Sequence, residues 1–150
     1  MRFEHTAVIP ASRERVWDLL MDVGTVSACF PGVESVRQVD PEHFFVVQRV
    51  QVGPIRLRFE GNVTVTERDH AAGRGTMRIE GSDKATQGFV KATVAVVVSR
   101  RGPDISEVSV TAEAAVMGKL GEFGQPVMQR KADAMISEFA KNLGRRVCEN

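Results

Sequence analysis

Hydrophobic and polar residues alternate along most of this chain, and the alternation is clearest over residues 55–67. One side of that segment would carry Ile55, Leu57, Phe59, Val63 and Val65, and the other side carries mostly charged and polar residues. A period of two is typical of a half-buried β-strand. Gly61 interrupts the pattern, which indicates a bulge or a bend in a curved sheet.

Similar patterns, bounded by turn residues, predict six further strands. They cover residues 2–9, 33–39, 44–52, 75–83, 88–99 and 106–117. Short polar stretches join most of these strands, and consecutive strands with short connections pair antiparallel. We therefore expect one antiparallel sheet, in which Phe3, Ala7 and Ile9 of the first strand share a face.

Two regions instead show the spacing of a helix. Residues 11–22 predict a short helix that Ser12 caps and that Asp22 and Gly24 end, and one or two more turns fit before Pro31. The apolar side of this helix would carry Val16, Trp17, Leu19 and Leu20. From about Pro126, apolar residues recur every three or four positions and predict a long helix that ends near Gly144.

These elements define an α+β fold. We expect a seven-stranded antiparallel curved sheet that grips a long C-terminal helix, with two short helices after the first strand. The chain has 150 residues. That length suits a single domain over residues 1–150, with a core that needs neither a disulfide nor a metal.

Composition narrows the function further. The net charge is +1, which gives no electrostatic basis for binding nucleic acid. The two cysteines, Cys29 and Cys148, have no metal-site spacing, so we expect a reduced, cytoplasmic protein without a metal or another cofactor. The N-terminal residues do not form a signal peptide, and no apolar run is long enough to span a membrane.

The glycine-rich segment "MGKLGEFGQPVM" at residues 117–128 poses a separate question, because glycines before a helix are typical of phosphate-binding loops. Here the lysine follows the first glycine, no serine or threonine follows it, and the preceding strand ends an antiparallel series. We expect Gly118 to adopt a positive φ where the chain turns toward the helix. Gly121 and Gly124 would allow close backbone approach or leave space beside the helix.

Several stretches in this order resemble the carbon monoxide dehydrogenase G-subunit family, which is part of the START-like helix-grip (SRPBCC, Bet v 1-like) superfamily. They are "ERVWDLLMD", "CFPGVESV", "VQVGPIRLRFEGNVTVTERD" and "VMGKLGEFGQPVM" followed by "FAKNL". The resemblance implies a hydrophobic tunnel between the sheet and the last helix, which in this superfamily takes lipids, sterols, polyketides or other apolar ligands.

For this family the resemblance also implies a non-catalytic accessory role beside a molybdenum hydroxylase of the carbon monoxide dehydrogenase type. Such proteins are linked to recruiting that enzyme to the membrane, which implies peripheral or transient contact with its inner face. Membrane-anchoring members carry an extension beyond the last helix, whereas this sequence ends at Asn150. We therefore do not expect anchoring by a C-terminal tail.

Residues that could carry chemistry are few. His5, His43 and His70 lie on the first strand and in two turns, and we expect surface or edge positions for them. Cys29 is expected to pack in the core. The alternation leaves the direction of Arg49 and Gln51 open and brings no set of titratable groups to the inner face, as acid–base catalysis would require.

The predicted ligand-binding residues are apolar side chains of the inner face and of the last helix. They are Phe59, Val63, Met77, Ile79, Val94, Val110, Ala112, Ala114, Phe123, Val127, Met128 and Met135. The same residues would also suit a filled core, which leaves an interaction module with a vestigial tunnel as one possibility. The main hypothesis is a carrier for an apolar molecule, lipid or quinone-like; the alternative is a polyketide cyclase or dehydrase using the same tunnel.

Overall fold

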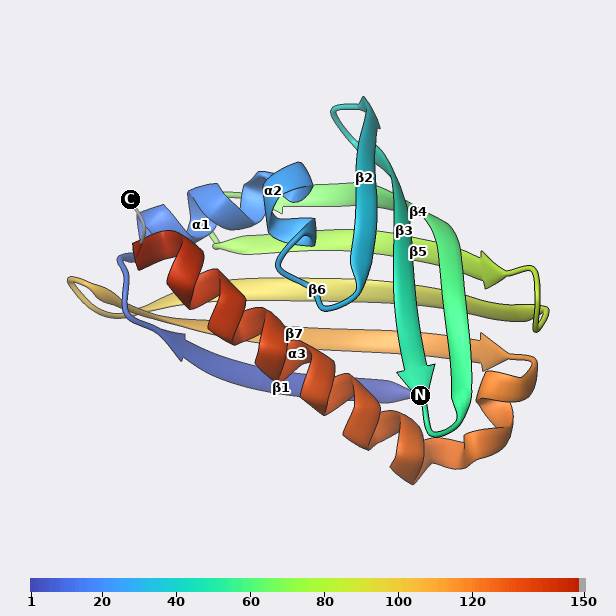
Figure 1. Ribbon diagram of the computed structural model, residues 1–150. Coiled ribbons are helices and arrows are strands. Elements are labelled where there is room, and N and C mark those ends of the chain that lie inside the picture. Colours follow the sequence, from blue (N-terminus) through green and yellow to red (C-terminus); the bar gives the residue numbers. More distant parts are fainter. Residues whose placement is uncertain (149–150) are drawn as a thin grey trace.

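One antiparallel sheet of seven strands forms the body of the molecule, in the order β1-β7-β6-β5-β4-β3-β2 (Figure 1). The computed structural model describes residues 1–148. The strands are β1 (Arg2–Ile9), β2 (Val33–Asp40), β3 (His43–Val52), β4 (Ile55–Asp69), β5 (Arg74–Asp83), β6 (Gly88–Gly102) and β7 (Ile105–Met117). Hairpins connect β2 through β7, and β1 pairs with β7, so β1 and β2 form the two edges of the sheet.

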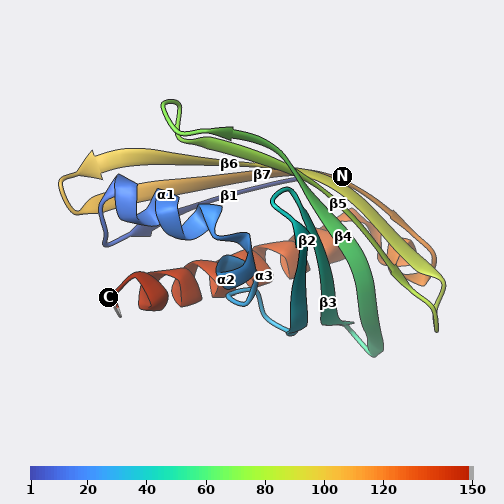
Figure 2. The same ribbon diagram turned by 90° about the horizontal axis from the view of Figure 1, so that it is seen from above.

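The helices complete the predicted helix-grip arrangement, which is confirmed. The short helices α1 (Arg13–Met21) and α2 (Val23–Ser27) follow β1. After β7, the 3-10 helix η1 (Lys119–Phe123) leads into α3 (Gly124–Cys148), which crosses the concave side of the sheet (Figures 1 and 2). Among the strands, α3 packs most closely on β1.

Local signals at the short helices predicted their boundaries with partial success. The Ser12 hydroxyl accepts a hydrogen bond of 3.3 Å from the Arg15 amide, as an N-cap should. Asp22 ends α1 and also caps α2, because its carboxylate accepts a hydrogen bond from the Thr25 amide. Gly24 was predicted to break the helix but lies inside α2. The chain therefore turns at Asp22 alone.

The end of α3 also differs from the prediction. The helix does not end at Gly144 but continues to Cys148. Leu143 and Val147, on either side of this glycine, are 0% and 3% exposed. Burial of such side chains outweighs the roughly 1 kcal/mol cost of a glycine within a helix. Arg145 and Arg146 occupy the last turn, where positive charge is favourable.

Gly61 lies where two strands of the curved sheet approach closely, and not at a bulge. Gly61 of β4 pairs directly with Gly81 of β5, and the register shift lies farther along, between Val65 and Glu67. A Cβ atom at Gly61 would lie 2.3 Å from the carbonyl oxygen of Glu80. The missing side chain thus lets β4 and β5, two strands of the curved sheet (Figure 2), approach closely at this point.

The buried apolar residues form three separate clusters. The α1 cluster joins α1, α2 and the C-terminal half of α3 to the sheet, and includes Ile9, Val16, Trp17, Val98, Phe139 and Leu143. The η1 cluster joins η1 and the N-terminal half of α3 to the sheet, and includes Phe3, Val52, Leu57, Leu120 and Met128. The β3–β5 cluster includes Val23, Phe44, Val63 and Val65.

Ser106 is a polar exception within this core. It is 0% exposed, and its hydroxyl donates a hydrogen bond to the carbonyl oxygen of Ala11. We expect Ser106→Ala to lower the free energy of unfolding by about 1–3 kcal/mol, because a buried carbonyl loses its partner. Urea denaturation followed by circular dichroism measures this loss. The exposed Ser99→Ala variant is the control, and an equal effect in both variants would contradict the role of the bond.

Candidate ligand-binding site

The strand register gathers predicted site residues into rows across the concave face. One row runs from β4 to β1 through Val65, Met77, Val94, Ala112 and Phe3, each a direct partner of the next. The neighbouring row runs from β3 to β7 through Phe44, Val63, Ile79, Ala92 and Ala114. Except for the aromatic side chains at their ends, these rows consist of aliphatic residues and methionine. The inner face is therefore a continuous apolar floor beneath α3.

The twelve predicted residues divide among the clusters. Phe59, Ala112, Ala114, Phe123, Val127 and Met128 belong to or pack against the η1 cluster. Val63, Met77 and Ile79 do so in the β3–β5 cluster, and Val110 packs against the α1 cluster. Val94 of β6 and Met135 of α3 belong to none of the three. The strand residues of the predicted set thus form a continuous surface on the sheet. The twelve residues together do not form one packed unit.

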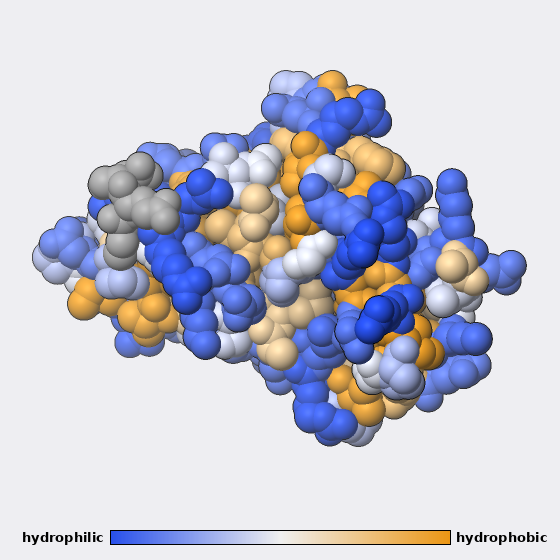
Figure 3. Space-filling view, viewed as in Figure 1, coloured by the Kyte–Doolittle hydropathy of each residue, from blue (hydrophilic) through white to orange (hydrophobic). Residues whose placement is uncertain are grey.

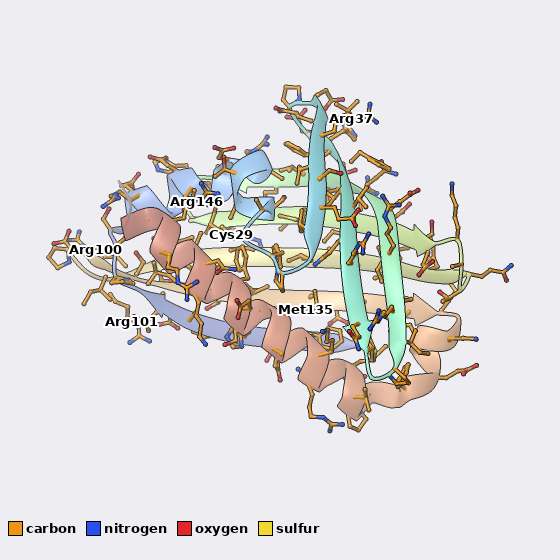
Figure 4. All side chains as sticks on the ribbon, in the orientation of Figure 1. Cys29, Arg37, Arg100, Arg101, Met135 and Arg146 are labelled. Atoms are coloured by element: carbon orange, nitrogen blue, oxygen red, sulfur yellow. The ribbon has the colours of Figure 1, made fainter. Side chains whose placement is uncertain are left out.

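The centre of the concave face is only half-buried. Val94 and Met135 are both half-buried although neither reaches a cluster, and Met77, Ile79 and Ala112 around them are half-buried as well. Figure 4 shows Met135 on the middle of α3, over the strands. In the space-filling view, apolar side chains are visible between polar ones in the middle of this side of the molecule (Figure 3). An apolar ligand could cover this surface.

Polar side chains at inner-facing positions are rare and lie apart. Gln48 of β3 shares the inward face with Phe44, and its amide donates a 2.9 Å hydrogen bond to the carbonyl oxygen of Pro31. His5 of β1 faces α3 and lines a cleft with Ile136 and Phe139. Four strands separate β1 from β3. These two side chains therefore do not converge on one substrate in the way that acid–base catalysis requires.

The sequence interpretation did not foresee that the side chains of His5 and Gln48 point inward. His5 was expected at a surface or edge position and does lie on an edge strand, but its ring faces the concave side. The signal was present, because His5 alternates in phase with Phe3 and Ala7. Gln48 was missed because β3 buries residues on both faces, including Phe44 and Val47, so a period of two does not identify its inner side.

A network of charged residues from β2, β3 and β4 lies on the outer face. Arg49, whose direction the sequence left open, is exposed and pairs with Glu34, and Arg58 pairs with Glu34 at 3.1 Å and with Glu60 at 2.8 Å. Hydrogen bonds from Arg49 and then Arg58 lower the pKa of Glu34. Gln51 is exposed as well. This network favours the ionised form of Glu34 and holds its carboxylate on the outer face, away from the candidate site.

Cys29 lies in the α1 cluster and is 4% exposed. Burial raises the pKa of its thiol, and Arg146 only partly opposes that shift. A thiol with a raised pKa stays protonated at neutral pH and is a poor nucleophile. The expectation that Cys29 packs as a small apolar residue is confirmed. Within residues 1–148, no three His, Cys, Asp or Glu side chains gather as a metal site would require.

The glycine-rich segment forms the chain reversal between β7 and α3. Gly118 has the expected positive φ of 84°, and Gly124 has a φ of 79°. A Cβ atom at Gly121 would lie 2.9 Å from the carbonyl oxygen of Val116, which confirms close backbone approach there. Between these glycines, Leu120 is buried in the η1 cluster. The segment thus positions the start of α3 against the sheet.

A curved antiparallel sheet that holds a long C-terminal helix on its concave side defines a START-like helix-grip protein. The chain belongs to the carbon monoxide dehydrogenase G-subunit (CoxG) family, whose model matches residues 6–148. No curated protein sequence matches the chain. None of the helices described for residues 1–148 is both long and apolar enough to cross a lipid bilayer.

Solved structures share this fold at low sequence identity. A conserved protein from Geobacillus kaustophilus is 19% identical, with a TM-score of 0.90 over 99% of this chain and 96% of its own. A START superfamily protein from Mycobacterium smegmatis is 17% identical, with a TM-score of 0.73 over 99% and 97%. The Zhui aromatase/cyclase from Streptomyces sp. R1128 is 14% identical, with a TM-score of 0.71 over 98% and 93%.

Proposed function

We propose that this protein binds an apolar small molecule, lipid or quinone-like, between the sheet and α3, and that it acts as a non-catalytic carrier. The observation that carries the proposal is the half-buried apolar centre around Val94 and Met135, which belong to none of the three packed clusters. Ligand sites are mostly apolar, and flexible methionine suits varied apolar ligands. The inner-facing positions on the central strands β5, β6 and β7, away from the strand ends, are apolar or glycine, which suits a ligand without extensive polar groups.

The family supplies the cellular context of this proposal. Membership in the carbon monoxide dehydrogenase G-subunit family favours an accessory role beside a molybdenum hydroxylase of the carbon monoxide dehydrogenase type, in the cytoplasm or at the inner face of the membrane. Within this proposal the whole chain acts as one helix-grip domain. Affinity purification from the native cells should recover the hydroxylase, and native mass spectrometry of the same sample should show a bound apolar molecule.

Binding at the centre can be tested by filling it. We expect the neutral fluorescent probe N-phenyl-1-naphthylamine to bind the wild-type protein, and Val94→Trp to weaken that binding by about tenfold or more, since the indole would occupy the same space. Fluorescence titration measures the affinity. Thr93→Trp is the matched control, because Thr93 precedes Val94 in β6 and its side chain is exposed on the opposite face of the sheet. Unchanged affinity in Val94→Trp would contradict the assignment of the site.

A polyketide cyclase-like activity is the second candidate, and the fold shared with the Zhui aromatase/cyclase favours it. Against it, Gln48 and His5 do not converge, and Gln48 already donates to Pro31. This activity would require turnover of a linear polyketide into a cyclic product, which mass spectrometry detects. It would also require that His5→Leu or Gln48→Leu reduce the turnover.

A further inference from the structure

A surface groove runs between the edge strand β1 and the C-terminal half of α3. Its volume is about 290 Å³, and its walls include Ala7 and Ile9 of β1 and Ala140 of α3. No residue that lines the groove is among the twelve predicted for the central site. The groove is therefore separate from the site of the proposed carrier function, and its own ligand has to be inferred from its lining.

The polar side chains of the groove each carry a hydrogen-bond donor. They are the imidazole of His5, the hydroxyl of Ser137 and the ammonium group of Lys141, and no carboxylate lines the groove. Lys141 is exposed, whereas His5 and Ser137 are half-buried. Across residues 1–148, no hydrogen bond or ion pair engages any of these three side chains. An accepting, negatively charged group would therefore find free donors here.

The interior wall of the groove is apolar. Next to it, and sharing His5, Ala7, Ile9 and Ala140, is a narrow cleft of about 10 Å³. Except for His5, its lining is apolar and includes Val108, Val110, Ile136 and Phe139. On α3, the open space where a Cβ atom of Gly144 would stand widens the groove. Donors at an apolar wall are the arrangement that binds an amphiphile.

We propose that this groove binds a small anionic amphiphile, a medium-chain carboxylate whose head group lies among His5, Ser137 and Lys141. The carboxylate accepts hydrogen bonds from these donors, and the ammonium group of Lys141 balances its charge. The alkyl chain covers Ala7, Ile9 and Ala140. The groove is near the lower end of the size range of ligand pockets, which favours a chain of medium length.

Calorimetric titration with decanoate and with 1-decanol tests the head-group assignment. The wild-type protein is expected to bind decanoate about tenfold more tightly than 1-decanol, because only decanoate offers charge-assisted hydrogen bonds. Lys141→Glu should weaken decanoate binding by about tenfold or more. Lys131→Glu, on the same helix but outside the groove, has the same net charge and should retain the wild-type affinity.

Two further variants distinguish this groove from the central site. Ser137→Phe should block decanoate but leave binding of N-phenyl-1-naphthylamine intact, whereas Val94→Trp should do the reverse. Amide chemical shifts of Ala7 and Ala140 provide an independent readout in the wild-type protein. The proposal is overturned if decanoate does not bind, if it binds no better than 1-decanol, if Lys141→Glu binds it normally, or if only Val94→Trp blocks it. Each of these outcomes leaves the neutral probe's binding as a separate result.

Discussion

Leu143→Ala is expected to lower the free energy of unfolding by about 2–5 kcal/mol, as truncation of a fully buried leucine commonly does. Leu143 is 0% exposed and lies in the α1 cluster with Val16 and Val98. The truncation would leave a cavity where α3 meets α1 and the sheet. The size of the loss depends on how far these elements can move to fill that cavity.

Urea denaturation, followed by circular dichroism, measures the effect of Leu143→Ala. Ile105→Ala is a suitable control, because it removes a similar side chain that is 46% exposed, and its effect should remain within about 0.5 kcal/mol. Similar losses in both variants would show that Leu143 does not anchor the helix as the structure indicates.

Leu143 also contributes to holding α3 over the half-buried centre of the sheet. The α1 cluster holds the C-terminal half of α3 and the η1 cluster holds its N-terminal half. The helix is therefore fixed at both ends over a surface that it does not fully cover. Under the proposed function, a helix fixed in this way would not depend on a bound ligand for its position.

Alternation along the chain was sufficient to predict the sheet and its inner face. In β4, the odd-numbered residues from Ile55 to Val65 face inward as expected, and Leu57, Val63 and Val65 are buried. The sequence of a half-exposed strand shows which face is buried, because only the buried face is apolar. The alternation in strand β3 does not identify its inner face, because β3 buries residues on both faces. The direction of Gln48 could therefore not be predicted.

Other features depend on contacts between distant parts of the chain. Gly144 reads locally as a helix end, yet burial of Leu143 and Val147 extends α3 beyond it. The predicted site residues belong to different clusters because of where α3 crosses the sheet. The groove between β1 and α3 likewise joins His5 with Lys141, which are far apart in sequence. A local sequence pattern cannot predict contacts between residues this far apart in the chain. Only the folded structure shows them.

Gly61 and Gly144 should respond in opposite directions to the same substitution. Gly61→Ala is expected to lower the free energy of unfolding by about 3 kcal/mol or more, the upper end of overpacking effects. Its Cβ atom would lie 2.3 Å from the Glu80 carbonyl oxygen and 2.8 Å from the Gly81 Cα atom. Both are backbone atoms, so β4 and β5 would have to separate at this point of their ladder.

Gly144→Ala is the matched case, because it adds the same methyl group inside α3. A Cβ atom there has no neighbour within 4 Å, and alanine favours the helix over glycine by about 0.5–1 kcal/mol. We therefore expect a gain of that size. Urea denaturation of both variants and the wild type gives the comparison. Loss of stability in Gly144→Ala would argue for a helix that ends at Gly144, and a neutral Gly61→Ala would show that β4 and β5 can separate without cost.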